Sequence, residues 1–405
     1  MKIINTALGL LLCAPITTNT AADFSGFATL GLVYSDSEIY GYRRDISEDE
    51  GVFKEDIDFK NHSLLGLQFD HLFNNKTDFV IQAVVRQRSK NNLDRTISLA
   101  FLRHQLSPNW QIRVGRIAPD LFMFTESRDI DFSYVWATVP KEVYSIIPYR
   151  SIDGGDISYE KRFENATLTT KVFAGTSEGE IIGGGALETV KSKNMLGLSI
   201  TYDEFEWSIQ GKYTRATFAN EAITNTLIGN EIRKVPDFIW PNKEAFIPRI
   251  GIESDSAKYA AINGQRMINN WLLSAEFSRI TSSSELLRKI SNYYVSAAYQ
   301  LDHHSFYAVI GNSTSDEWQF EEENVATQFI PELIHGLEEN FNFYSANQKS
   351  YSLGWRWNVT SSTSITTQYT HTKIDEHGST LWLVNGPHSP AEDVNSVLLN
   401  VSTLF

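Results

Sequence analysis

A serine between two glycines is a candidate for nucleophilic chemistry in this chain. Gly175-Thr-Ser-Glu-Gly179 matches the G-x-S-x-G spacing, in which a catalytic serine stands on a sharp turn between a buried strand and a helix. Here the motif follows an amphipathic segment, and Gly183-Gly-Gly185 comes shortly after it. This context indicates a flexible Gly-rich loop, so we predict no catalytic residue and no enzyme activity.

The histidines offer weak support for a metal centre. His303-His304 fall in a short polar connection without a cysteine or a third histidine nearby, whereas a zinc site needs three or four protein ligands. We therefore expect solvated turn residues there and predict neither a metal nor a cofactor. Further histidines are scattered along the chain and keep an enzyme open as an alternative: His62, His71, His104 and His371.

Charged residues give a stronger indication of function than these serine and histidine motifs. Where apolar and polar residues alternate, the polar face repeatedly carries cations, at Arg86, Arg88, Arg113, Arg162, Lys171, Lys212 and Arg356. Acidic candidates on such faces are fewer, namely Asp70, Glu160, Glu206 and Glu276. A long connection that follows Arg113-Val-Gly-Arg-Ile-Ala-Pro119 adds carboxylates at Asp120, Glu126, Asp129 and Asp131.

These two sets of charges would act together if the long connection folded toward the basic face. Carboxylates would then stand opposite guanidinium groups across a narrow opening, and the field between them would orient dipolar solutes and tune ion selectivity. In the alternative, the cations pair locally with carboxylates of the wall, and these pairs only neutralise the charges of the wall. We favour the first interpretation.

The same connection is rich in aromatic residues, at Phe122, Phe124, Phe132, Tyr134 and Trp136. These rings offer faces on which sugar rings could stack. They could equally wedge the connection against a wall, because aromatic side chains bury a large apolar area. We favour the packing role.

The elements that must position these residues are strands. In the segment 77–88, every second residue from Phe79 to Val85 is apolar, and the residues between them are mostly polar. Segments of about ten residues with this period are typical of tilted membrane-spanning strands. We predict sixteen of them, at 24–34, 61–72, 77–88, 95–106, 109–117, 154–163, 166–175, 193–202, 205–216, 250–267, 270–281, 290–301, 305–314, 348–359, 364–374 and 394–405.

Short and long connections alternate between these strands. Turns such as Asn74-Asn-Lys76 alternate with long acidic or Gly-rich stretches, among them 118–153, 176–192, 217–249 and 315–348. This predicts an all-β fold, a transmembrane antiparallel β-barrel with short periplasmic turns and long external loops. An even number of strands closes such a barrel without a free edge, as a sheet in lipid requires. The strand at 250–267 is inferred partly from the direction that its neighbours must take.

The bulk composition and the first residues agree with an exported membrane protein. The net charge of −14 argues against a nucleic-acid partner. Lys2, the apolar stretch 7–16 and the small residues Thr20-Ala21-Ala22 predict a signal peptide over 1–22. Cleavage after Ala21 or Ala22 would remove Cys13 and leave a barrel domain over 23–405.

The last residues alternate between apolar and mostly polar side chains up to the aromatic Phe405. We expect this segment to close the barrel by pairing with the strand near Phe24. Acidic residues gather in the first long connection, from Asp45 to Asp58, and in the seventh, from Glu321 to Glu339. We expect solvated carboxylates there that bridge to lipopolysaccharide through divalent cations, with adhesion as an alternative.

The chain resembles a Gram-negative outer-membrane porin. The resemblance rests on the signal peptide, the opening strand 24–32, Val114-Gly-Arg116 before the long third loop, and Phe405. Segments 127–136, 140–144, 155–159 and 271–278 are similar to a little-characterised porin-like family of marine gammaproteobacteria. A turn of the Pro-Glu-Phe-Gly-Gly type, found in the third loop of general porins, is missing here.

The resemblance implies a homotrimer of sixteen-stranded barrels in the outer membrane that passes small hydrophilic solutes and ions passively. It makes Asp120, Glu126, Asp129 and Asp131 candidates for the constriction and Arg86, Arg88 and Arg113 the facing pore wall. It also makes Phe405 part of the signal that the barrel-assembly machinery reads. The alternatives are a substrate-selective channel for sugars or anions and, from another class, an outer-membrane enzyme or adhesin.

Overall fold

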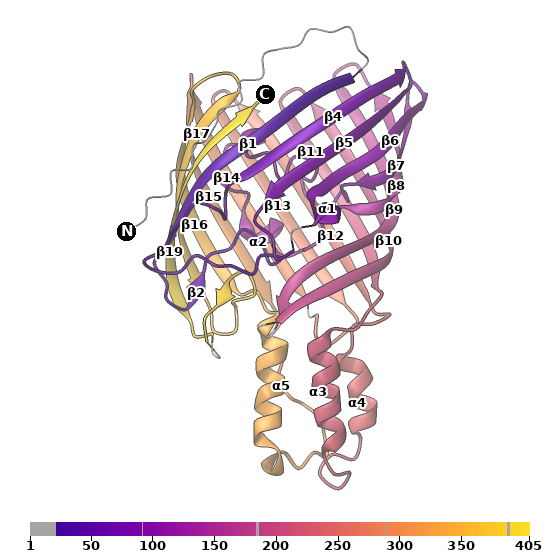
Figure 1. The fold of residues 1–405 in the computed structure, drawn as a ribbon, viewed down its shortest axis with the longest axis vertical. Coiled ribbons are helices and arrows are strands. Elements are labelled where there is room, and N and C mark those ends of the chain that lie inside the picture. The colour runs from indigo at the N-terminus through magenta and orange to yellow at the C-terminus, as the bar shows by residue number, and fades with distance from the viewer. Residues whose placement is uncertain (1–21, 91, 184–185, 288, 387–388) are drawn as a thin grey trace, which may run out of the picture.

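Sixteen antiparallel strands close into a barrel (Figure 1). The computed structural model describes residues 22–90, 92–183, 186–287, 289–386 and 389–405; the predicted signal peptide lies outside them except for Ala22. The wall strands are β1 (Ala22–Ser35), β4 (Leu64–Asn74), β5 (Thr77–Arg86), β6 (Ile97–Ser107), β7 (Trp110–Ile117), β8 (Ile152–Arg162), β9 (Ala166–Gly183), β10 (Ala186–Glu204), β11 (Trp207–Phe218), β12 (Ser256–Ile268), β13 (Trp271–Ser282), β14 (Ile290–Leu301), β15 (His304–Ser315), β16 (Gln348–Asn358), β17 (Thr363–Ile374) and β19 (Glu392–Leu404). The predicted fold class and all sixteen predicted strands are confirmed.

The barrel closes where its first and last strands meet. β1 pairs with β19 from Phe27 opposite Leu404 to Ser35 opposite Ser396. The backbone N–H of Phe405 donates to the carbonyl of Gly26 at 2.9 Å, and the N–H of Gly26 donates back to the carbonyl of Phe405 at 2.7 Å. The expected pairing of the last strand with the first is therefore confirmed, and both edges of the sheet are paired.

The outer face of the barrel is apolar. Leucine, valine and isoleucine side chains point outward and stay exposed, for example Leu30, Val85, Val114 and Leu353, which are 59 to 65% exposed. Aromatic pairs flank the short turns, with ring centroids 4.8 Å apart for Trp110 and Tyr159 and 5.1 Å apart for Trp271 and Tyr299. An apolar band with an aromatic girdle is what a barrel wall in lipid requires.

Three of the predicted long connections, 176–192, 217–249 and 315–348, differ in detail from the prediction. The expected Gly-rich loop at 176–192 is mostly strand, because β9 and β10 continue as one hairpin far beyond the neighbouring strands. A β-bulge shifts the register between Ser192 and Met195, and such a bulge reverses the alternation of faces that marks a strand in the sequence. The Gly175–Gly179 motif therefore lies within β9, and Ser177 Oγ donates to the carbonyl of Ser151 at 2.6 Å.

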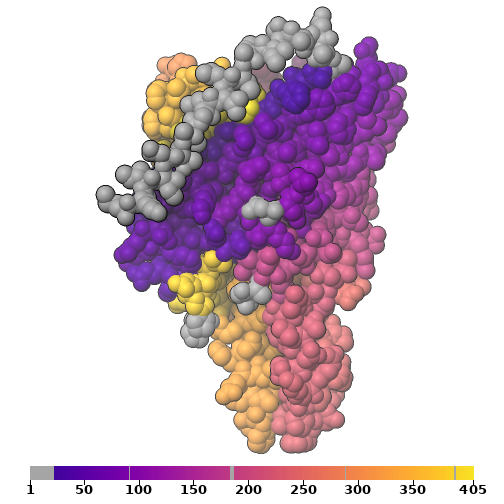
Figure 2. Space-filling model, in the orientation of Figure 1, coloured from indigo at the N-terminus to yellow at the C-terminus, as the bar shows by residue number. Residues whose placement is uncertain are grey.

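The other difference is a helical projection that the alternation does not reveal. α3 (Ile223–Lys234), α4 (Lys243–Ile250) and α5 (Pro331–Phe343) stand beyond the barrel at the end opposite the C-terminus (Figure 1), where they form a narrow extension (Figure 2). They pack around the fully buried Trp240 together with Ile232, Phe246 and Leu337. Among the described residues, no helix is long and apolar enough to cross a membrane.

Smaller elements lie in the loops that lead into the barrel. These are β2 (Tyr40–Gly41), β3 (Ile57–Asp58), β18 (Leu383–Val384), α1 (Leu93–Thr96), α2 (Lys141–Tyr144) and the 3-10 turns η1 (Asp131–Ser133) and η2 (Thr327–Phe329). β2 pairs with β18, which ties the first loop to the last. We call the end of the barrel with the tight turns and the C-terminus the short-turn end, and the opposite end the long-loop end.

Candidate functional site: the interior of the barrel

The third loop, residues 118–151, lies inside the barrel and reaches the far wall. Trp136 Nε1 donates to Ser296 Oγ of β14 at 2.8 Å, and Asn400 Nδ2 of β19 donates to the carbonyl of Ala137 at 2.6 Å. The loop leaves from β7 and returns to β8, which lie on the other side of the closed sheet from β14. It therefore crosses the interior and divides it.

The first loop, residues 36–63, also folds inward. Its Arg44 pairs with Asp131 of the third loop at 2.6 Å, and the hydroxyl of its Tyr42 lies 3.0 Å from Nε2 of His62. Asp45 and Glu48 are only 2% and 0% exposed, so the expectation that they are solvated is wrong for these two. Their carboxylates are buried because cations of the wall and of the third loop surround them.

Three of the predicted wall cations meet carboxylates of the two inward-folded loops. Arg86 Nη1 lies 3.2 Å from Glu48 Oε1 and its Nη2 lies 3.4 Å from Asp45 Oδ2. Arg113 contacts Asp156 of the neighbouring strand at 2.6 Å and Glu126 of the third loop at 2.8 Å. Lys212 Nζ contacts Asp120 at 2.6 Å.

The other three predicted wall cations have different surroundings. Arg356 donates from Nη2 to the carbonyl of Phe132 at 2.9 Å, and its guanidinium lies 4.7 Å from the centre of the Phe132 ring. Arg88 lies just beyond β5, and its Nη1 donates to the carbonyl of Val84 at 2.9 Å. Arg162 lies at the short-turn end, 78% exposed, and pairs with Glu160 at 2.6 Å, so the structure does not bring it to the others.

All four predicted carboxylates of the third loop are in ion pairs. Asp120 pairs with Lys171 as well as Lys212, Glu126 pairs with Arg113, Asp129 with Arg150 at 2.8 Å, and Asp131 with Arg44. Burial alone would raise the pKa of Asp120, but Lys212 and Lys171 hold that pKa well below its usual value. The third-loop carboxylates thus touch cations directly, and pairing of a cation with a carboxylate of the wall, which was the alternative, is seen at Arg113 with Asp156.

The five aromatic residues of the third loop separate into two groups. Phe122, Tyr134 and Trp136 are buried, and the Trp136 ring packs edge-on against Tyr294 of β14 with 5.4 Å between centroids. Phe124 and Phe132 are partly exposed and line a cavity of about 580 Å³ at the short-turn end, beside Arg356. Three of the rings therefore pack the loop against the wall, and two face open space.

Several residues at this site were missed by sequence reasoning. Arg44 and Arg150 hold Asp131 and Asp129, and the hydroxyl of Tyr144 donates to Glu276 Oε2 of β13 at 3.0 Å. The signal for Arg44 was its position beside Arg43 in a loop whose charged residues are mostly acidic. Arg150 carries no comparable signal, because it lies outside any alternating segment.

A charged chamber of about 450 Å³ opens between the third loop and the wall at the long-loop end. Its lining includes seven cations, Arg86, Arg88, Arg95, Arg116, Arg150, Lys191 and Lys193, and five carboxylates, Asp94, Asp129, Asp153, Glu178 and Glu180. Among the described residues, Arg88 and Lys193 are the lining cations that form no ion pair within 4 Å. Cations therefore outnumber carboxylates by two among the side chains that line the chamber.

No family model matches this chain, and no curated protein matches its sequence. Solved structures do resemble it. The outer membrane channel DcaP of Acinetobacter baumannii has a TM-score of 0.56 at 10% identity, over 97% of this chain and 100% of the other. The anion-selective porin from Comamonas acidovorans has a TM-score of 0.55 at 10% identity, over 95% and 99%.

OmpF of Salmonella typhi, solved with daunomycin, has a TM-score of 0.51 at 13% identity, over 95% of this chain and 97% of the other. These likenesses extend over almost the whole of every chain compared. The chain therefore has the fold of the outer-membrane porins.

Proposed function

We propose that this protein is a passive diffusion channel of a Gram-negative outer membrane, which passes small hydrophilic solutes and ions. The observation that carries the proposal is the division of the molecule into an apolar outer wall and a charged interior crossed by the third loop. An apolar outer face suits lipid and a polar interior suits water and solutes. The porin fold and the channels among its structural neighbours support this reading, and we propose no enzyme activity.

The third loop would form the constriction. It stands opposite Arg86 and Arg113 and is held by ion pairs on one side and by packed aromatic rings on the other. In a narrow water-filled passage, rings of charged side chains select ions by sign. The field of this constriction would come from the cations without a carboxylate partner, since paired charges largely cancel at a distance.

Those unpaired cations favour anions as the preferred solutes. Arg88 and Lys193 line the charged chamber and have no carboxylate within ion-pair distance in the described part of the chain. A sugar-selective channel is favoured less, because three of the five aromatic rings that could stack on a sugar are buried against the wall. We therefore propose a weakly anion-selective pore.

Planar-bilayer recording of the purified protein tests the proposal. We expect stepwise ohmic conductance and, in a tenfold gradient of potassium chloride, a reversal potential of the sign that chloride preference produces. Absence of conductance from correctly folded barrels would overturn the channel. Cation preference would overturn the anion assignment and leave the channel intact.

We also propose that residues 1–22 direct export, that the barrel assembles as a homotrimer near lipopolysaccharide, and that the assembly machinery reads Phe405. The Phe405 side chain is 61% exposed at the short-turn end, while its backbone closes the sheet. Deletion of Phe405 should reduce the amount of inserted barrel more than it reduces the conductance of each inserted barrel. Quantification of inserted protein beside single-channel recording checks this.

A further inference from the structure

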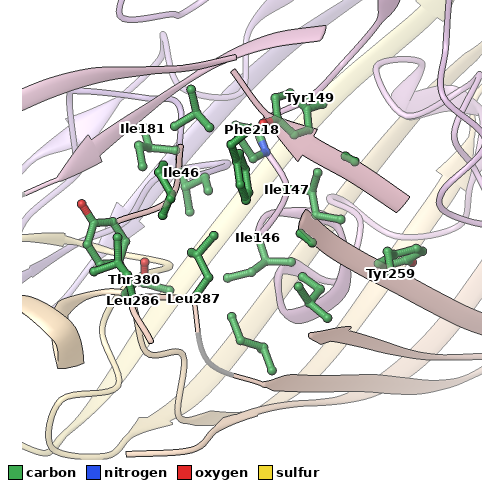
Figure 3. Close-up of a pocket in the computed structure, with 18 of the residues that line it drawn as sticks. Ile46, Ile146, Ile147, Tyr149, Ile181, Phe218, Tyr259, Leu286, Leu287 and Thr380 are labelled. Atoms are coloured by element: carbon green, nitrogen blue, oxygen red, sulfur yellow. The ribbon is translucent and has the colours of Figure 1, made fainter. Parts of the chain in front are cut away.

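An apolar chamber lies inside the barrel, separate from the charged one. It measures about 160 Å³ and lies between the third loop and the wall formed by β9 to β13, toward the long-loop end. Figure 3 shows Ile146, Ile147 and Tyr149 of the third loop converging with Phe218 of β11 and Leu286 of the connection after β13. Its lining is almost entirely carbon.

Within this carbon lining, a few polar atoms are left without partners. The hydroxyls of Tyr149, Thr214 and Tyr344 and Oε2 of Glu188 are buried and form no hydrogen bond with any described residue. Tyr149, Thr214 and Glu188 are 8%, 4% and 1% exposed. A buried hydroxyl without a partner is unfavourable, so a molecule that filled the space and paired with one of them would relieve that cost.

The size and lining of the chamber define the class of ligand. An apolar cavity of roughly 150 Å³ stays dry and takes up benzene, so this one fits a single aromatic ring. A charged ligand is excluded because burial of an unpaired charge among carbon atoms is very costly. The Glu188 carboxyl, whose Oε1 already accepts from the backbone N–H of Thr224 at 3.1 Å, would in addition repel an anion.

We propose that the apolar chamber is a binding site for a small uncharged aromatic molecule that carries one hydroxyl or carbonyl group, of the size of phenol. The hydroxyls of Tyr149 and Tyr344 supply the polar contact, and Ile146, Phe218 and Leu286 surround the ring. The site goes beyond the proposed passage of hydrophilic solutes and does not depend on conduction. It would take a class of molecule that the charged chamber does not favour, because the lining of that chamber is mostly polar and charged.

Binding can be measured by fluorine NMR with the full-length mature protein in lipid nanodiscs, without detergent that could fill the chamber. 4-Fluorophenol and fluorobenzene serve as probes, and nanodiscs without protein correct for partition into lipid. We expect saturable binding of both probes, with 4-fluorophenol bound more tightly. Binding no greater than in empty nanodiscs would overturn the site.

Two variants with matched controls locate the probe. Ala216→Phe on β11 places a ring into the chamber, and Ala275→Phe on β13 adds the same ring to the exposed outer face. Tyr149→Phe removes one unpaired hydroxyl, and Tyr299→Phe removes a hydroxyl at the outer aromatic girdle. Circular dichroism shows whether each variant is folded.

We expect Ala216→Phe to abolish saturable binding of both probes, and Ala275→Phe to leave it unchanged. Tyr149→Phe should weaken the binding of 4-fluorophenol by about threefold to tenfold, as the loss of one neutral hydrogen bond does. The affinity for fluorobenzene should stay unchanged. Unchanged affinity in folded Ala216→Phe would overturn the site. If Ala216→Phe does not fold, the nearly isosteric Tyr149→Phe variant tests the proposal instead. Equal loss of affinity for both probes, or no loss of affinity for either probe, would overturn the proposed contact.

Discussion

Two segments of the third loop are held inside the barrel by opposite means. The charged segment, residues 120–131, is held by ion pairs with Arg44, Arg113 and Lys212. The apolar segment, residues 146–149, is held by burial of Ile146, Ile147 and Tyr149. Asp129 of the charged segment lines the charged chamber of about 450 Å³, and the apolar segment lines the apolar chamber of about 160 Å³.

The difference teaches how one loop can divide a barrel. Ion pairs and hydrogen bonds demand fixed distances, so each charged contact specifies a position for the loop. Apolar contacts are not directional, and a segment held only by them can leave a void when the neighbouring side chains do not interlock. Each chamber is lined by the same kind of side chain that holds the neighbouring segment.

The largest effect should come from breaking the charged segment. Lys212→Met removes the side chain that pairs with Asp120 at 2.6 Å and is 2% exposed. Loss of one partner of a buried pair costs about 3 kcal/mol, although Lys171 keeps part of the attraction. We expect the fraction of molecules with a released third loop to rise by about 100-fold, measured as the rate of protease cleavage within residues 118–151.

Arg162→Gln is the matched control for that variant. It removes a cation from an exposed pair at the short-turn end, and exposed pairs contribute about 0 to 1 kcal/mol. Equal protease sensitivity of the two variants would show that the charged segment does not hold the loop.

A smaller effect should come from the apolar segment. Ile146→Val removes one buried methylene from a side chain that is 8% exposed, which costs about 1 kcal/mol. Release of the loop should increase by about fivefold in the same cleavage assay. An effect as large as that of Lys212→Met would show that apolar burial restrains the third loop at least as strongly as the ion pairs do.

The charged chamber should respond in selectivity more than in stability. Arg88→Gln removes a cation that has no ion pair in the described structure, so no carboxylate is left alone. We expect the ratio of chloride to potassium permeability to fall by about twofold to threefold, as the loss of one partly screened charge produces. Reversal potentials in a potassium chloride gradient measure this permeability ratio. An unchanged ratio would show that Arg88 does not line the pore.

The smallest effect should be that of mild acid. Nearby cations hold the pKa values of Asp120, Glu126 and Asp129 below their usual values despite burial. The stabilisation from a lowered carboxyl pKa is complete above the ordinary value of about 4 and is lost only as the pH falls through the lowered one. Protease cleavage of the third loop should therefore not increase between pH 7 and pH 5, and should increase only below about pH 4.

An increase already at pH 5 would mean that these carboxyl groups titrate normally and that their ion pairs do not hold the loop. The Lys212→Met variant sharpens the test, since Asp120 loses its nearest cation there. Loop release in that variant should begin at a higher pH than in the unchanged protein.

Much of the wall could be predicted from the sequence. A strand with lipid on one side and a polar interior on the other must alternate, so segments such as 77–88 show their role locally. The prediction failed where the alternation was broken. The bulge between Ser192 and Met195 hid the extension of β9 and β10, and α5 is marked in the sequence only by Pro331 and the spacing of Ile334, Leu337 and Phe341.

The candidate site was predicted as a set of residues but not as a set of contacts. The sequence named Asp120, Glu126, Asp129 and Asp131, yet it placed Asp45 and Glu48 in solvent and offered no partner for Arg150. Asp131 is 87 residues away from Arg44 along the chain. No local pattern reports a contact between two irregular loops.

The closed wall follows from the amino-acid sequence, because its period of two and its short turns result from lipid on one face and from hydrogen bonding along each edge. The tertiary structure was needed to show which carboxylate meets which cation and where the apolar chamber lies. Those features depend on how the first and third loops meet inside the barrel. Their positions there come from distant contacts with β11, β14 and β19.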